Sequence, residues 1–458
     1  MHVSRSTYFP PFLRHHESPC IARRSPATFS LVNAAAIVSL LFSMTNYMPF
    51  SALVSFLGLL LLPMVVPLAA TRDWRIFTVT MTLVYFIFSA VVYDPSSLFD
   101  LAFYRRDGNF FVTFGGLLLL LVFGRPSNAE TWATALLLAT AAIYGVFFAI
   151  WLATGLTPRE DWTFVPYSQF NPLFYSNNAA GGFLAVLSAV GLGLAWARRS
   201  VPLLCASVLL ILFCVFSASR GSLLGLFCGL VIFAITERAG IVLVPSLLVA
   251  TFSILSLLIG LAMAFLSEFD ISQTESYLRF LLYLDDGFVD EKTANVLIRT
   301  HFLFPLAASL GLQSPLFGLG FGSFDDRPYN IVQIVPYLIA VNRPAEILHT
   351  DSHAHNTFLH VFAELGLFGL CATTFFFAAL INLTRDIRER GLRFGLQIAF
   401  WTLITSSITE HRAFTPSNAL PFVLLLGLAL GGRFAARFAW SALSGGAIGG
   451  QSADQRAR

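Results

Sequence analysis

The stretch DSHAHNTFLHVFAELGLFGL, residues 351–370, begins with polar residues and continues as an apolar run. His355 and Asn356 stand directly before the run, and His360 and Glu364 lie within it. Asn356, His360 and Glu364 recur at every fourth position, so on a helix they form one polar stripe. Ionisable side chains inside an apolar span are costly and usually face a cavity or a partner. The stretch predicts a membrane helix with a polar site at its start, although His360 and Glu364 can also simply pair with each other.

The rest of the chain shares this apolar character. Of its 458 residues, 56% are hydrophobic and only 12% are charged. A soluble globular domain carries roughly 25% charged residues, so the composition excludes that class. The five cysteines show no CxxC spacing and most lie in apolar runs, which favours packing over a disulfide framework or a metal site. The expected fold is all-α, that of a polytopic integral membrane protein.

Apolar segments of membrane-span length recur along the chain. Twelve spans are predicted, at residues 29–46, 50–70, 76–93, 109–124, 131–154, 180–197, 201–217, 221–236, 240–266, 357–383, 394–409 and 416–432. The expected organisation is a cytoplasmic N-terminal segment (1–28), a first helix block (29–266), an extracytoplasmic catalytic and substrate-binding segment (267–356), the last three spans (357–432) and a disordered cytoplasmic tail (433–458).

Arginine placement predicts the orientation, because short cytoplasmic loops are enriched in Arg and Lys. With a cytoplasmic N-terminus and alternating spans, 18 of the 28 basic residues fall inside and 10 outside. Five of those 10 belong to segment 267–356, which is too long for the rule, so the short loops compare as 18 against 5. Both termini are therefore predicted to be cytoplasmic, and segment 267–356 to face the outside.

His355 and Asn356 are the first candidate site. A span beginning near Thr357 presents its N-terminus to the outside, where the helix dipole and unpaired N–H groups favour an anion such as a phosphate. A neutral His355 there can take a proton from an attacking hydroxyl. Two alternatives remain open. The polar residues can form an N-cap of the helix, for which Ser352 would suffice. His353 and His355 can also bind a metal ion, although no Cys or carboxylate evidently completes the ligand set.

Two arginines are the second candidate site. Arg220 lies in SASRGS (217–222), a very short turn on the outer side, where it either reaches the membrane interface or binds an anionic headgroup. Arg299 lies in an apolar part of segment 267–356 that reads as an amphipathic helix, and it requires an anionic partner.

A glycine-rich stretch, SPLFGLGFGSF, follows Arg299. Its glycines allow a tight backbone path; they are Gly318, Gly320 and Gly322. The stretch does not follow a recognisable strand of a nucleotide-binding unit, and the chain has no Walker A sequence.

Taken in order, several stretches resemble the O-antigen ligase and polymerase family of bacterial envelope enzymes. They are NPLFYSNNAAGGFLA (171–185), SASRGSLLGL (217–226), RTHFLFPLAASLGLQSPLFGLGFGSF (299–324) and HNTFLHVFAELGLFGL (355–370). The last is the most specific, since it combines His-Asn, a Glu nine residues after the His, and two glycines.

The resemblance implies a helical membrane fold similar to the C-type glycosyltransferases. It implies transfer, on the outer side of the bacterial inner membrane, of a glycan from undecaprenyl diphosphate to a hydroxyl of lipid A-core, a lipid-linked glycan or a protein. No cofactor, metal or nucleic acid is expected to take part, and membrane lipids surround the protein. In this pattern His355 is catalytic, Arg220 and Arg299 bind the diphosphate, and Asn356 orients His355.

The remaining candidate residues take supporting roles. Asn178, in the first matching stretch, is a predicted substrate-binding residue. Glu364, His360 and the glycines Gly318, Gly320 and Gly322 are predicted to be structural or to tune the site.

Other functions remain open within and outside the family. A repeat-unit polymerase and a protein oligosaccharyltransferase share these motifs. A transporter of the same lipid-linked glycan would have inverted repeats and broken helices, and the sequence displays neither. A non-catalytic assembly subunit would leave His355 and the arginines without a purpose.

Overall fold

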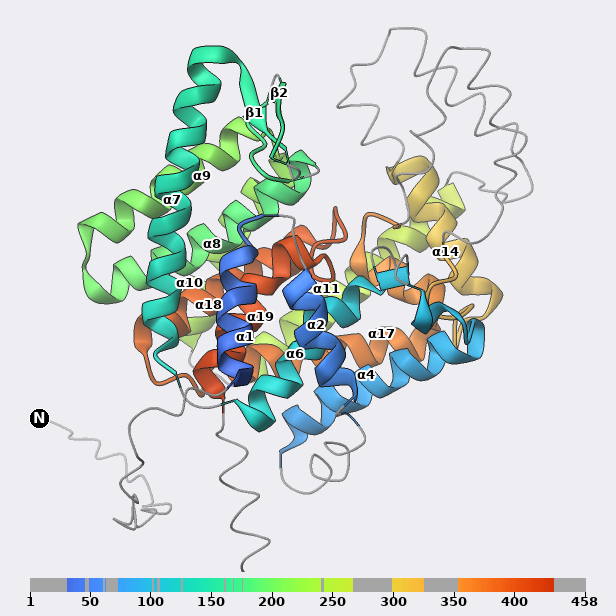
Figure 1. Cartoon of the computed structure of the whole chain (residues 1–458). Helices are drawn as coiled ribbons and strands as arrows, with labels where there is room; N and C mark the ends of the chain where they lie inside the picture. The colour runs from blue at the N-terminus through green and yellow to red at the C-terminus, as the bar shows by residue number, and fades with distance from the viewer. Residues whose placement is uncertain are drawn as a thin grey trace, which may run out of the picture.

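The computed structural model describes residues 31–45, 49–60, 62, 73–100, 103–104, 108–124, 127–159, 162–167, 169–174, 176–239, 243–266, 299–324 and 353–431. These residues are mostly helical (Figure 1). The α-helices are α1 (Leu31–Phe42), α2 (Pro49–Leu60), α4 (Trp74–Tyr93), α6 (Asn109–Phe123), α7 (Ala129–Thr154), α8 (Asn177–Arg198), α9 (Val201–Phe216), α10 (Arg220–Ala239), α11 (Leu243–Leu266), α14 (Phe304–Gln313), α17 (Thr357–Thr384), α18 (Arg390–Ser406) and α19 (Pro416–Leu430).

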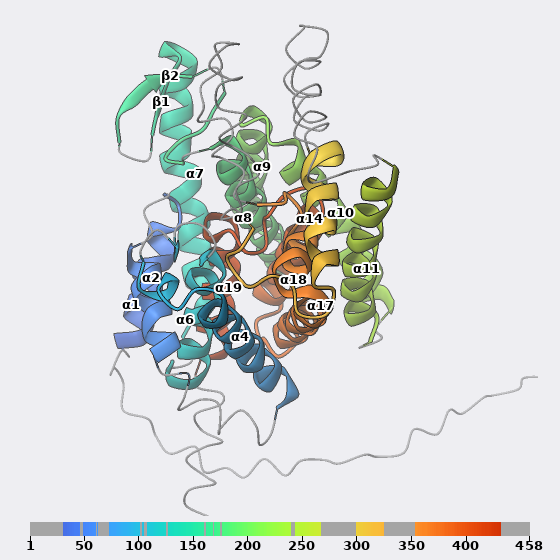
Figure 2. The same ribbon diagram turned by 90° about the vertical axis from the view of Figure 1, so that its right-hand side faces the viewer.

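The remaining regular elements are short. A 3₁₀ turn, η1, covers Ser97–Phe99, and a π-helical turn, η2, covers Arg299–Leu303 directly before α14. Strands β1 (Leu156–Pro158) and β2 (Phe164–Pro166) pair antiparallel after α7. Figure 2 shows this hairpin at the far end of α7.

Every predicted span coincides with a helix, which confirms an all-α membrane protein. Six helices are long and apolar enough to cross a membrane, namely α4, α7, α8, α10, α11 and α17. The apolar helices α1, α6, α9 and α19 are shorter. The total of twelve spans stays a prediction. The terminal segments 1–28 and 433–458, and residues 267–298 and 325–352 of the predicted outer segment, lie outside the described residues.

Helix α8 is the centre of the core, and it packs against α9, α10, α18 and α19. In the most apolar stretch of α8, 89% of the residues are buried inside the protein, whereas the corresponding shares are 28% for α7 and 22% for α11. The exposed apolar side chains of α7 and α11 suit a lipid environment. Small residues bring α8 and α18 together. A Cβ at Gly395 would lie 2.5 Å from the Val190 carbonyl oxygen, so only glycine permits this approach.

Helix α17 is interrupted in its middle. Gly366 has φ 61° and ψ −159°, a backbone conformation that is essentially restricted to glycine. A Cβ there would lie 2.5 Å from the backbone carbon of Leu316. A continuous helix is expected from the apolar run of residues 357–383, so the interruption at Gly366 corrects that expectation.

The loop after α14 fills the interruption. The N–H groups of Leu367 and Phe368 donate to the carbonyls of Pro315 and Leu316, at 2.8 and 3.0 Å. In return the Gly320 N–H donates to the Glu364 carbonyl at 2.8 Å. The backbone groups that the break exposes are therefore paired inside the protein, as a membrane interior requires.

The predicted tight path through the glycine-rich stretch is confirmed. Gly318, Gly320 and Gly322 all have positive φ, of 73°, 115° and 89°. The stretch lies against α17, where the Phe324 N–H donates to the Glu364 carboxylate at 3.1 Å. These contacts attach the loop after α14 to α17.

Ion pairs join one set of helix ends. At the end of α8, Arg198 pairs with Glu130 of α7 at 2.8 Å. At the start of α4, Arg75 pairs with Asp386, just after α17, at 2.8 Å. All of these residues belong to the side that the arginine distribution assigns to the cytoplasm. The opposite ends of α8 and α17 carry the polar residues described next.

Candidate functional site

Four segments meet at the start of α17. They are residues 353–356 before that helix, η2, the loop 407–415 between α18 and α19, and the N-terminal turn of α8. Glu410 of the loop lies at their centre, with only 7% of its surface exposed. The site is therefore assembled from parts of the chain that are more than 200 residues apart.

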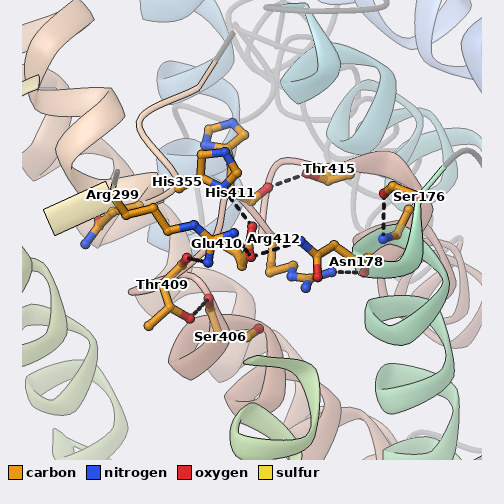
Figure 3. Close-up of polar contacts among 12 residues, drawn as sticks. Ser176, Asn178, Arg299, His355, Ser406, Thr409, Glu410, His411, Arg412 and Thr415 are labelled. Atoms are coloured by element: carbon orange, nitrogen blue, oxygen red, sulfur yellow. Dashed lines mark hydrogen bonds and ion pairs between the residues drawn. The ribbon is translucent and has the colours of Figure 1, made fainter. Parts of the chain in front are cut away.

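Glu410 binds three of the surrounding side chains (Figure 3). Its Oε2 accepts from Nδ1 of His355 at 2.9 Å. Its Oε1 lies 2.7 Å from Nη2 of Arg299 and accepts from Nδ2 of Asn178 at 3.1 Å. Three predicted site residues are thus brought together by one carboxylate that was not predicted.

The carboxyl group of Glu410 is ionised despite its burial. Burial on its own raises the pKa of this group. The hydrogen bond from His355 and the positive charges of Arg412 and Arg299 outweigh burial, and they lower the pKa from 4.5 to about 2. An ionised carboxylate at Nδ1 fixes the tautomer and orientation of the His355 ring.

Arg412 closes the other side of the site. Its guanidinium is buried and donates to the Asn178 carbonyl and, at 3.2 Å, to Oγ of Ser219. Gly182 on α8 makes room for it, because a Cβ there would lie 2.7 Å from Nη1 of Arg412. The loop 407–415 is thereby anchored on α8.

Asn356 is the N-cap of α17. Its Oδ1 accepts from the N–H groups of Phe358 and Leu359 at 3.0 and 3.1 Å, and its Nδ2 donates to the Ile408 carbonyl at 2.9 Å. The Thr357 N–H donates to the Ser407 carbonyl at 2.9 Å. The expected phosphate site on unpaired N–H groups is therefore wrong, since these groups bind the protein itself. The capping alternative is correct, with Asn356 in place of Ser352.

The two predicted diphosphate ligands lie in different surroundings. Arg220 begins α10, next to Ser219, and its side chain is exposed without a hydrogen bond or ion pair to the described residues. Arg299 is held by Glu410 and lies 3.4 Å from the Thr409 carbonyl, with 21% of its side chain exposed. Both arginines and His355 lie at the same end of the helices.

The polar stripe of α17 continues below the site. Nε2 of His360 lies 3.6 Å from Oε2 of Glu364, so the two buried side chains face each other at a distance longer than a hydrogen bond. His353 and His355 do not converge as a metal pair. His355 turns to Glu410, whereas the His353 ring stacks on that of His411 at 4.4 Å. Burial, and then the neighbouring histidines, lower the pKa of His411 well below its usual value.

Sequence reasoning missed the loop between the last two spans. Glu410, His411 and Arg412 are consecutive in the sequence, and all three are buried. A charged triplet in a short loop between two apolar spans, on the same predicted side as His355, was the available signal. None of the motifs that the sequence offers includes this triplet.

Comparison with known families matches residues 205–374 to a family described as O-antigen ligase. The match contains Arg220, Arg299, His355 and Glu364. Asn178 and Glu410 lie outside it, on either side. No curated protein matches the chain.

Proposed function

Because residues 205–374 match the O-antigen ligase family, we propose that the chain transfers a glycan from a polyprenyl diphosphate to an acceptor hydroxyl. The observation that carries this proposal is the pairing of His355 with the ionised Glu410, at one end of the helices together with Arg299 and Arg220. A base and cationic groups for the departing diphosphate are what such a transfer requires.

His355 is the general base. Glu410 accepts the Nδ1 proton, so Nε2 is the nitrogen that takes the proton of the acceptor hydroxyl. The acceptor oxygen then forms a bond to the anomeric carbon as the bond from that carbon to the diphosphate oxygen breaks. This in-line displacement inverts the anomeric centre, and Glu410 stabilises the imidazolium that His355 becomes.

The arginines stabilise the leaving group. The departing diphosphate gains negative charge, and guanidinium groups match phosphate geometry with paired N–H donors. Glu410 fixes Arg299 in advance, whereas the exposed Arg220 is available to the diphosphate directly. A donor that already carries its activating group needs neither a nucleotide nor a metal ion in the transfer step.

The membrane arrangement belongs to the same proposal. Twelve spans with both termini in the cytoplasm, in a fold similar to the C-type glycosyltransferases, would place the site outside the inner membrane. The paired helix ends at Arg198 and Arg75, opposite the site, support this sidedness.

A polymerase and a protein glycosyltransferase would use the same residues and differ in the acceptor. A transporter is favoured by one observation only, the interruption of α17 at Gly366. The loop Pro315–Gly320 fills that interruption, so it does not line an open path between the helices.

Purified protein in detergent or liposomes provides the test. A polyprenyl-diphosphate glycan is offered with lipid A-core, with a second lipid-linked glycan or with a protein acceptor, and the products are analysed by mass spectrometry. A new glycosidic bond that depends on His355 supports the proposal, and the productive acceptor identifies the type of transferase. Glycan crossing the membrane without bond formation contradicts it.

A further inference from the structure

Three histidines that the proposed transfer does not use lie together beside the site. His353 precedes α17, His360 lies in its first turns, and His411 comes from the loop 407–415. One ring nitrogen of each lies within 4.8 Å of those of the other two. The centre of such a triangle is at most about 2.8 Å from each nitrogen, so small movements of the rings would bring all three to the Zn–N distance of about 2.0–2.1 Å.

Burial makes these imidazoles unlike surface histidines. His360 and His411 are only 2% and 7% exposed. The Nδ1 atoms of both have no hydrogen-bond partner among the described residues. A buried polar nitrogen without a partner destabilises the folded protein. One ligand bound between the two rings would give a partner to both Nδ1 atoms.

A carboxylate supports the cluster from behind. Nε2 of His360 lies 3.6 Å from Oε2 of Glu364, whose other oxygen is held by the Phe324 N–H at 3.1 Å. A histidine that binds a metal through one nitrogen commonly presents the other to a carboxylate. Because Nε2 of His360 is the nitrogen near Glu364, Nδ1 is the nitrogen that would bind the ion.

We infer that His353, His360 and His411 form a site for a divalent transition-metal ion of the zinc class. Three neutral imidazoles suit zinc, copper or nickel, whereas magnesium and calcium take oxygen ligands. The fourth position would be filled by water, since Glu364 lies on the far side of the His360 ring.

The ion has a structural role in this inference. His411 follows Glu410 directly, and His353 lies two residues before His355. An ion bound to both histidines would fix the loop 407–415 on the start of α17 and hold the His355–Glu410 pair in place. The inference assigns the ion no part in the chemistry of the proposed transfer, only in the placement of this pair.

Metal content tests the inference without reference to activity. Full-length protein, purified without a histidine tag, is loaded with zinc, desalted and measured by elemental analysis. The visible absorption of bound cobalt(II) reports the ligand set. One equivalent per chain is expected, and His411→Asn and His353→Asn should lose it. Glu364→Gln should weaken zinc binding by about 10–100-fold, as loss of a supporting carboxylate does.

His355→Asn is the matched control, because His355 lies outside the triangle and should leave zinc binding unchanged. If His411→Asn does not fold, the half-buried His353, which lies outside the helix, provides the second variant. Folded wild-type protein that binds no zinc would overturn the inference. So would retention of the ion in folded His353→Asn, or its loss in His355→Asn.

Discussion

Nδ1 of His355 and Oε2 of Glu410 lie 2.9 Å apart, although the two residues are separated by 55 positions and belong to different segments. Glu410 is buried and its pKa is lowered to about 2, so the contact joins an imidazole to a carboxylate that stays ionised. This geometry orients the ring and assigns distinct roles to its two nitrogens.

His355→Ala should abolish turnover and leave donor binding nearly intact. A general base contributes about 10²–10⁴-fold to a rate, and His355 is proposed to contact the acceptor hydroxyl, not the diphosphate. Single-turnover transfer and equilibrium binding of a labelled donor separate the two effects. Unchanged turnover in this variant would contradict the assignment of the base.

Glu410→Gln should lower turnover by roughly 10-fold or more, since the ring loses the carboxylate that stabilises its charged form. Arg299 also loses its ion-pair partner, so donor affinity should change as well. Glu237→Gln, at an exposed position near the end of α10, is the matched control and should behave like the wild type. Equal behaviour of the two variants would remove Glu410 from the mechanism.

Arg220→Ala and Arg299→Ala should each weaken donor binding by about 10–100-fold, the loss expected for one charge-assisted hydrogen bond to phosphate. Lys at either position should restore binding only in part, because it lacks the paired donors of guanidinium. Arg198→Ala removes the same charge at the opposite end of α8 and should bind donor normally. Isothermal titration with a polyprenyl diphosphate measures all of these affinities.

Gly366→Ala should destabilise the protein by about 1–3 kcal/mol, because a side chain at φ 61° is strained and its Cβ would meet the Leu316 backbone. Gly145→Ala is the matched control, since nothing lies within 4 Å of the added Cβ. Thermal unfolding in detergent compares the two variants. Equal melting temperatures would show that α17 does not need its interruption.

A cysteine at Thr163 should react with a membrane-impermeant reagent in intact spheroplasts, because this exposed position lies on the predicted outer side. A cysteine at Glu237 is exposed on the predicted inner side and should react only after lysis. Both are made in a background without the native cysteines. Ser323 is unsuitable for this test because it is buried. The reverse labelling pattern would invert the proposed topology.

Much of the site could be read from the sequence because its residues interrupt apolar patterns. Arg220, Arg299 and His355 stand out as ionisable groups in a chain with few charges, and all three fall at one end of the helices. Glu410 and Arg412 are also ionisable groups beside apolar spans, but no local sequence pattern indicates their partners His355 and Asn178, which are more than 50 positions away. The break at Gly366 was equally hidden, since the loop that satisfies its backbone lies about 50 residues earlier in the chain.

Local sequence patterns were sufficient to predict a helical membrane protein and the positions of its long helices. Length and hydropathy act locally, through the cost of exposing polar groups to lipid. The tertiary structure alone decided which charges meet. It gave Asn356 a capping role, separated His353 from His355, and placed Glu410 against His355 and Arg299. Such contacts depend on the packing of helices that are far apart in the sequence, for example the close packing of Gly395 against Val190. No periodicity along the chain encodes this packing.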